Sequence, residues 1–95
     1  MSEQSATIRR RFDLRGQVQG VGFRPYVYRL AARHALAGYV ANNSNGAVIE
    51  IEGPPTALDA FERDLVTELP PLARIAALVR VELAPQGDMS FRIRM

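Results

Sequence analysis

A glycine-rich segment near the start of the chain places the strongest constraint on what this sequence can fold into. It reads GQVQGVGFRP over residues 16–25 and lies between a predicted strand and a predicted helix. Glycines let the backbone curl so that successive N–H groups point inward, and the first turn of a helix adds N–H groups without partners. Arg24 adds a positive charge where the helix dipole disfavours one, and a bound anion would remove that conflict. The segment therefore predicts a backbone cradle for a phosphoryl group.

The hydrophobic pattern on either side of this segment predicts an α+β fold. Strands are expected near residues 8–18, 37–42, 47–53 and 75–83, a short closing strand at 91–94, and helices at 25–34 and 56–69. Asn45-Gly46 predicts a hairpin turn of the primed type between the second and third strands. The order β-α-β-β-α-β with one added strand is that of the ferredoxin-like split βαβ fold, an antiparallel sheet with two helices on one face.

Local features refine these elements. Pro25 suits the first helical position, because its fixed φ is helical, and it places Arg24 at the helix boundary. Thr56 is expected to cap the second helix, and Pro70 with the following proline ends it. The arginines at residues 9–11 are expected to form a solvated strand face rather than a nucleic-acid patch. In the fourth strand the apolar residues that share one face are Ile75, Ala77, Val79, Val81 and Leu83.

The composition excludes several classes of function. A chain of 95 residues with 47% hydrophobic residues predicts one domain over residues 8–95, preceded by a disordered polar tail at residues 1–7. The absence of cysteine excludes disulfides, thiolate catalysis and cysteine metal sites. No signal peptide and no apolar run near the ~20 residues of a membrane span are present, so a cytoplasmic protein is expected. All twelve basic residues are arginine, and the net charge of +2 would help collect a small anion.

Two separated motifs resemble the acylphosphatase family. The first is G-x-V-Q-G-V-x-F-R within residues 16–24, and the second is GYVAN at residues 38–42. The longer run VQGVGFRPYVYRLA, together with PPLARI at residues 70–75, resembles more specifically the N-terminal acylphosphatase-like domain of the hydrogenase-maturation carbamoyltransferases. The resemblance covers residues 8–94, with both motifs in the expected order.

This resemblance implies a hydrolase that cleaves the carboxyl–phosphate bond of small acyl phosphates, with carbamoyl phosphate as the preferred substrate. It implies that Arg24 binds the phosphoryl group and that Asn42 orients the attacking water, while the substrate phosphate accepts the proton. No metal and no cofactor are expected, because phosphoryl transfer from a reactive anhydride depends mainly on position and charge. The backbone groups expected to bind the substrate with Arg24 belong to Gln19, Gly20, Val21, Gly22 and Phe23.

Three functions remain open at this stage. The chain is a module of a larger carbamoyltransferase, a free-standing acylphosphatase, or a non-catalytic phosphate-binding regulatory domain on the same scaffold. The proline after Arg24 and the PPLARI run favour the module. The expected partners are a small acyl-phosphate substrate and further domains of the larger protein, but neither nucleic acid nor a membrane. The isolated domain is expected to be monomeric.

Two positions are weakly specified by residue type alone. Asn42, Asn43 and Asn45 all lie in turn-prone sequence, where asparagine is commonly structural, and only the G-Y-V-x-N spacing selects Asn42. The residue before the leucine of L-x-G is commonly glycine or asparagine in the family, and here it is Ala35. If the first helix ends there in a left-handed conformation, alanine should cost about 1 kcal/mol.

Overall fold

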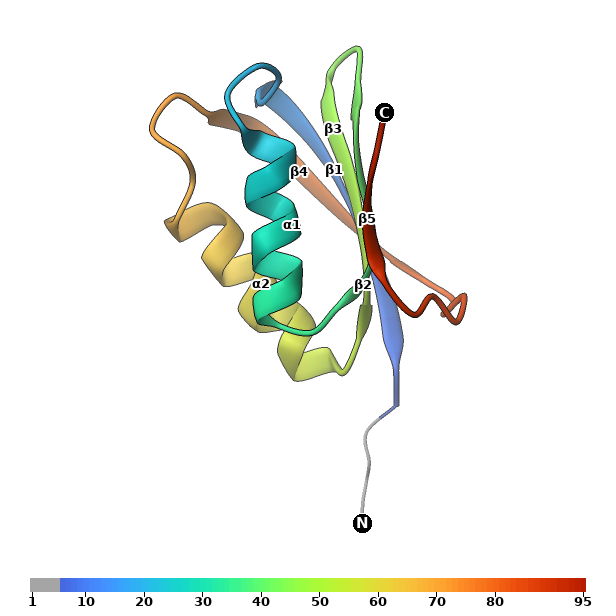
Figure 1. Ribbon diagram of the computed structural model, residues 1–95. Coiled ribbons are helices and arrows are strands. Elements are labelled where there is room, and N and C mark those ends of the chain that lie inside the picture. The colour runs from blue at the N-terminus through green and yellow to red at the C-terminus, as the bar shows by residue number, and fades with distance from the viewer. Residues whose placement is uncertain (1–5) are drawn as a thin grey trace.

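The computed structural model describes residues 6–95, which form two helices packed on one face of a five-stranded sheet (Figure 1). The predicted α+β fold is confirmed, whereas the predicted tail at residues 1–7 lies largely outside the described residues. Within residues 6–95 no helix is both long and apolar enough to span a membrane. The elements are β1 (Ile8–Gln17), α1 (Phe23–Arg33), β2 (Ala37–Asn43), β3 (Gly46–Gly53), α2 (Pro55–Thr67), β4 (Arg74–Leu83) and β5 (Phe91–Arg94).

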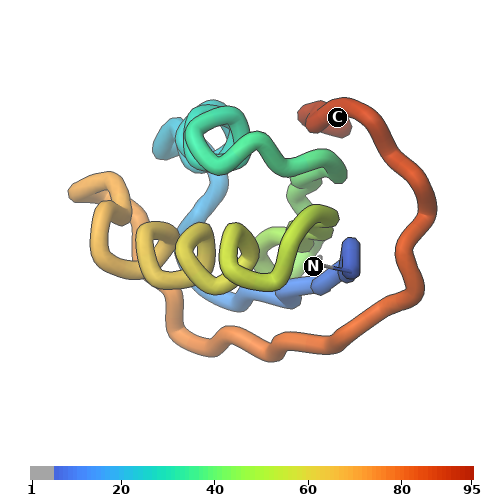
Figure 2. The backbone as a smooth tube through the Cα atoms, turned by 90° about the horizontal axis from the view of Figure 1, so that it is seen from below, coloured from blue at the N-terminus to red at the C-terminus, as the bar shows by residue number. Residues whose placement is uncertain are grey.

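The strand order β4-β1-β3-β2-β5 brings the functional segments to one end of the sheet. β1 pairs antiparallel with β3 and β4, and β2 pairs antiparallel with β3. β5 lies parallel to β2, so the sheet is mixed rather than wholly antiparallel. Figure 2 shows the chain running from β4 around the outside of the sheet to β5. The loop at residues 18–22, the hairpin turn at residues 43–46 and the end of β5 therefore meet at what we call the loop end (Figure 1).

The core lies between the sheet and the two helices, as the hydrophobic pattern predicts. The predicted faces of both helices are buried, except that Leu69 lies beyond the end of α2 and His34 is half-buried. Helix α2 begins at Pro55 and has Pro54 at its N-cap, so the predicted cap at Thr56 is wrong. The buried core side chains include Phe12, Leu14, Val27, Leu30, Ile49, Ile51, Leu58, Phe61 and Leu65.

Arg9 and Arg10 at the start of β1 are buried, so the prediction of a solvated strand face is wrong for these two, whereas Arg11 is partly exposed. Arg9 is 1% exposed and lies on the helix-free face, where its guanidinium donates to Glu50 at 2.7 Å and to Glu52 at 2.8 Å. Arg10 points to the opposite face, where it contacts Asp59 of α2 at 3.0 Å. A buried guanidinium is tolerated here because carboxylates surround it and satisfy its donors.

Beyond a bulge near its start, the apolar face predicted for the fourth strand lies away from the core, whereas Ile75 before the bulge packs against the core. The pairing register of β1 with β4 shifts between Arg15 and Gly16, which marks a bulge. As a result Leu78 pairs with the core residue Leu14, while Val79 and Val81 lie on the helix-free face with 58% and 43% of their surface exposed. An alternating pattern defines two faces but does not say which of them a bulge turns toward the core.

Two predicted boundaries also differ from the structure. The hairpin loop is Ser44-Asn45, because Asn43 pairs with Gly46. Neither loop residue has a positive φ, so the turn is not of the primed type. Helix α1 begins at Phe23, which makes Pro25 its third residue and places Arg24 inside its first turn.

Ala35 has the left-handed conformation that its position suggests. Its φ is 55°, and it is the one residue other than glycine with a positive φ among residues 6–95. Its N–H donates to Ala32 O at 3.1 Å, and the N–H of Leu36 donates to Ala31 O at 2.9 Å. These two bonds form the Schellman arrangement that ends α1, in which glycine is the favoured residue.

We therefore expect Ala35→Gly to raise the free energy of unfolding by up to about 1 kcal/mol, because it removes the strain of a left-handed alanine. The matched change Ala32→Gly, at an exposed position inside α1, should lower the free energy of unfolding by about 0.5–1 kcal/mol. Urea denaturation of both variants measures the effect. A clear loss of stability in Ala35→Gly would contradict this account of the helix end.

On the helix-free face, the carboxyl group of Glu52 makes the stability of the fold depend on pH. Glu52 is buried and accepts hydrogen bonds from the N–H groups of Gln86 and Gly87, both at 2.8 Å, and from Arg9. Burial raises the pKa of Glu52, but these hydrogen bonds together lower it by more than burial raises it. The pKa of Glu52 therefore lies below the ordinary 4.5. A carboxyl group with a depressed folded-state pKa contributes stability above its unfolded-state pKa and loses that contribution as the pH falls.

The expected result is that the free energy of unfolding decreases on acidification below about pH 5, and that Glu52→Gln makes this decrease shallower. At neutral pH we expect Glu52→Gln to destabilise the fold by about 3 kcal/mol, because Arg9 remains buried with one carboxylate fewer. Asp13→Asn, which removes a partly exposed ion-pair partner of Arg11 on the same face, should cost less than about 1 kcal/mol. Denaturation at several pH values measures the free energy of unfolding of both variants. Equal losses of stability in the two would refute the stabilising role given to Glu52.

Candidate active site

The loop at residues 18–22 carries β1 into α1 through two left-handed glycines. Gly20 has φ 72° and Gly22 has φ 74°, and a Cβ at either would meet no atom within 4 Å. Glycine is therefore required here for backbone conformation and not for space. Gly22 is the N-cap of α1, and the first helical hydrogen bond runs from Tyr26 N to Gly22 O at 3.2 Å. The N–H groups that precede this bond have no acceptor within the helix and can bind an anion.

The other predicted binding residues hold this loop in place. Phe23 is buried in the core, and Val21 packs against the same core from the loop. Gln19 is exposed, but its side-chain amide donates to the carbonyls of Asn43 and Gly46 in the hairpin. The backbone of Gln19 remains a candidate donor to a substrate, whereas its side chain is already engaged.

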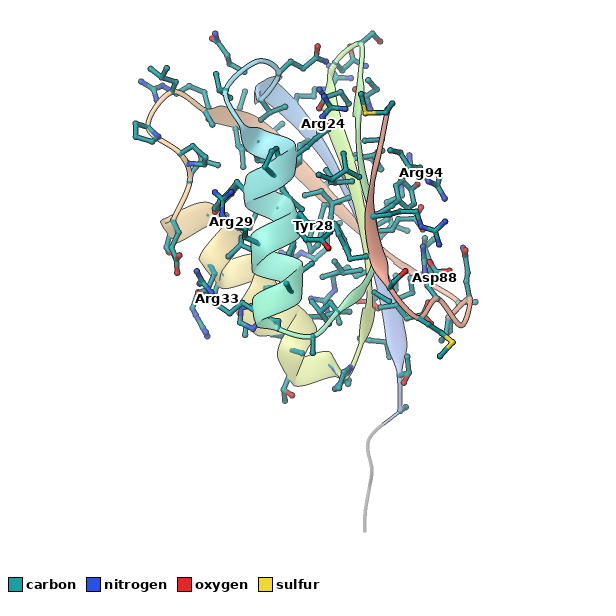
Figure 3. All side chains as sticks on the ribbon, viewed as in Figure 1. Arg24, Tyr28, Arg29, Arg33, Asp88 and Arg94 are labelled. Carbon is teal, nitrogen blue, oxygen red and sulfur yellow. The ribbon has the colours of Figure 1, made fainter. Side chains whose placement is uncertain are left out.

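Arg24 lies in the first turn of α1 on the side that faces the strands, while Arg29 and Arg33 lie farther along the helix (Figure 3). Its Nη1 donates to the backbone carbonyl of Arg94 at 3.3 Å, across 70 residues of sequence. No carboxylate among residues 6–95 forms an ion pair with it. The same Nη1 also contacts Met95 Sδ at 3.8 Å, and a half-buried guanidinium with these two partners keeps its other donors available for an anionic ligand.

The three asparagines near the hairpin differ in their hydrogen bonds. The Oδ1 atom of Asn43 accepts from the N–H groups of Asn45 and Gly46, both at 2.9 Å, and so stabilises the turn. The Oδ1 atom of Asn42 is buried and has no hydrogen-bond partner among the described residues. An unpaired buried acceptor costs free energy, so its presence favours a ligand or water at that atom. Asn42 is therefore the asparagine with a buried acceptor that lacks a partner, whereas the side chain of Asn45 is exposed.

Strand pairing brings these groups together. Ala41 of β2 pairs with Arg94 of β5, and Arg94 is the residue whose carbonyl receives the Arg24 guanidinium. Asn42 follows Ala41 directly, and Asn43, which receives Gln19, comes next. Sequence reasoning missed the contribution of Arg94, because a backbone carbonyl leaves no signal in residue type.

The charges of the molecule are distributed unevenly around this site. Every carboxylate side chain among residues 6–95 forms an ion pair with an arginine, and none of these pairs involves the arginines nearest the loop end. The loop end therefore keeps a positive charge that would attract a small anion. The arginines without a carboxylate partner there are Arg15, Arg24, Arg74 and Arg94.

A surface hollow of about 700 Å³ lies at the opposite end of the sheet beside residues 35–37 and 87–89. Its charged lining residues, Glu52 and Asp88, are both paired with Arg9. It therefore offers no unpaired charged group for chemistry, and the loop end remains the better candidate. His34 lies outside both places, since it contacts Asp64 of α2 at 2.8 Å and its hydrogen bond lowers the pKa of that carboxyl.

Comparison with known proteins identifies the family of the chain. The acylphosphatase family model matches residues 10–93. The carbamoyltransferase HypF of Rhizobium leguminosarum bv. viciae is 47% identical over 90 residues, which are 95% of this chain and 12% of that protein. The acylphosphatase of Moorella thermoacetica is 39% identical over 88 residues, which are 92% of this chain and 94% of that protein. The chain thus spans about an eighth of the carbamoyltransferase and nearly all of the small enzyme.

Solved structures give the same result. The chain matches full-length HypF in its phosphate- and nucleotide-bound form with a TM-score of 0.94 and 34% identity, over 100% of this chain and 13% of that one. It matches the acylphosphatase of Bacillus subtilis with a TM-score of 0.83 and 34% identity, over 95% of this chain and 100% of that one. The chain therefore belongs to the acylphosphatase family, whose members occur both as domains of HypF carbamoyltransferases and as free-standing acylphosphatases.

Proposed function

We propose that this domain hydrolyses the carboxyl–phosphate bond of small acyl phosphates at the loop end. Water attacks phosphorus in line with the departing carboxylate, so one phosphorus–oxygen bond forms as the other breaks. The proton of the water passes to a phosphate oxygen, and the products are a carboxylate and inorganic phosphate. The observation that carries the proposal is the unpaired buried Oδ1 of Asn42 close in the fold to Arg24, a guanidinium without a carboxylate partner.

The phosphoryl group would be held by backbone N–H groups and Arg24. The backbone N–H groups at the start of α1 and in the glycine loop would donate hydrogen bonds to the phosphoryl oxygens. A planar guanidinium can donate to two oxygens at once. These donors also meet the charge that develops on the equatorial oxygens in the transition state. The hydrogen bond from Arg24 to the Arg94 carbonyl supports this role, because it restrains the guanidinium before substrate arrives.

The attacking water would be oriented by Asn42. Its carboxamide can accept a hydrogen bond from the water through Oδ1 and donate one to the water through Nδ2, which a carboxylate cannot do. A neutral amide also adds no negative charge beside a phosphate, unlike an aspartate. No general base is required from the protein, since the departing carboxylate is a good leaving group and the phosphate can accept the proton.

The proposed substrate is carbamoyl phosphate, and the proposed setting is a hydrogenase-maturation carbamoyltransferase. The similarity to HypF carbamoyltransferases supports this, together with the proline after Arg24 and the PPLARI run. The free-standing enzyme remains the second candidate, because the Moorella thermoacetica acylphosphatase matches the chain over nearly its whole length. Comparing carbamoyl phosphate with benzoyl phosphate as substrates separates a narrow from a general acyl-group preference. Location in the cytoplasm stays a prediction.

We expect Asn42→Ala to lower kcat by about 100-fold while the Kd for inorganic phosphate changes little, because only water orientation is lost. Arg24→Ala should lower both phosphate affinity and turnover, since it removes the phosphate ligand itself. Steady-state phosphate release and titration with inorganic phosphate measure the two effects.

Two matched variants serve as controls. Arg29→Ala removes the same charge from an exposed position on the same helix, and Asn45→Ala removes an exposed amide from the same turn. Both should retain turnover. Near-normal turnover in Asn42→Ala would exclude the water-orienting role. Phosphate binding without turnover of either substrate by the unmodified chain would instead support the non-catalytic binding domain.

A further inference from the structure

We propose that the Gln19 side chain is a positioning residue that holds the hairpin bearing Asn42 against the phosphate-binding loop. Its Nε2 donates to two backbone carbonyls, those of Asn43 and Gly46, the latter at 3.3 Å. These residues lie 24 and 27 positions away along the chain and pair with each other across the hairpin. The catalytic part of this inference rests on the hydrolysis proposed above.

The hydrogen-bonding capacity of this amide leaves it little to offer a phosphate. A glutamine side chain has two N–H donors on one nitrogen, and Nε2 of Gln19 directs them at two carbonyls. The atom that remains, Oε1, is an acceptor and would repel a phosphoryl oxygen. Gln19 can therefore contact a substrate through its backbone N–H, while its side chain acts on the hairpin.

The two hydrogen bonds from Gln19 Nε2, which we call the tie, join the two halves of the candidate site. The loop supplies the backbone donors and leads directly into Arg24, whereas the hairpin carries Asn42 on β2. The backbone bond from Gly16 N to Asn45 O at 3.3 Å joins the same two segments at the end of β1. Past that point, between residues 17 and 22, the hydrogen bonds from the loop to the hairpin all come from Gln19.

The position of this tie matters because in-line attack requires the water and the phosphorus to be aligned. A misplacement of about 1 Å can cost about 100-fold in rate even when binding is unchanged. The tie lies at an exposed edge of the fold, outside the hydrophobic core, so its loss should affect turnover far more than global stability.

The test is Gln19→Met, which keeps the length of the side chain and removes both donors without adding charge. We expect kcat to fall about 10- to 100-fold while the Kd for inorganic phosphate stays within about twofold and the unfolding midpoint is unchanged. Gln17→Met makes the same exchange two residues earlier, at an exposed position outside the site, and should leave kcat unchanged. An equal loss of phosphate affinity and turnover would overturn the proposal, because it would mean that the amide contacts phosphate. Full turnover would also overturn it.

The double variant Gln19→Met/Asn42→Ala tests whether Gln19 acts through Asn42. If it does, kcat of the double variant should equal that of Asn42→Ala alone, whereas independent effects would multiply and contradict the proposal. Amide hydrogen exchange at Asn45 and Gly46 adds a readout that needs no activity. Faster exchange in Gln19→Met than in Gln17→Met supports the tie, and identical exchange overturns it. A chain without turnover would refute the proposed hydrolysis, and the exchange result would still decide the tie.

Discussion

The pairing of β1 with β3 is the constraint on which the rest of the molecule depends. It runs without a break from Ile8 opposite Gly53 to Arg15 opposite Gly46. Because the two strands are antiparallel, the loop that follows β1 and the hairpin that precedes β3 must lie at the same end of the sheet. The hairpin then places β2 beside β3, and pairing with β2 places β5. The candidate site is thus a consequence of register, since no single segment contains it.

Electrostatics separates the loop end from the remainder of the fold. Arg9 and Arg10 are buried, and they pair with carboxylates of β3, α2, β4 and the segment after β4, which ties β1 to all four. The carboxylates in these ion pairs lie away from the loop end. Arg24 is left with a carbonyl partner and the start of a helix, an arrangement that disfavours a cation unless an anion is present. The same charge distribution therefore stabilises one part of the molecule and prepares another for a ligand.

The sequence predicted the fold class and its elements because the core-facing residues of β1, β3 and both helices follow regular periods. It failed where local geometry breaks the period. The bulge near Gly16 reverses the faces of β4, and the Ser44-Asn45 turn differs from the primed turn that an asparagine–glycine pair favours. Burial of Arg9 was also not predictable, since an arginine in an alternating strand looks solvent-exposed until its carboxylate partners are known.

The sequence by itself determined the cradle and the order of the elements, because glycine conformation, helix starts and hydrophobic periods are local properties of the chain. It also selected Arg24 through its charge at the start of a helix, and Asn42 through resemblance to a family. The tertiary structure alone decided that Oδ1 of Asn42 is buried without a partner and which carbonyl restrains Arg24. It alone showed that Gln19 reaches the hairpin. The physical reason is that these contacts join residues 24 to 70 positions apart, and only the paired strands bring such residues within hydrogen-bonding distance.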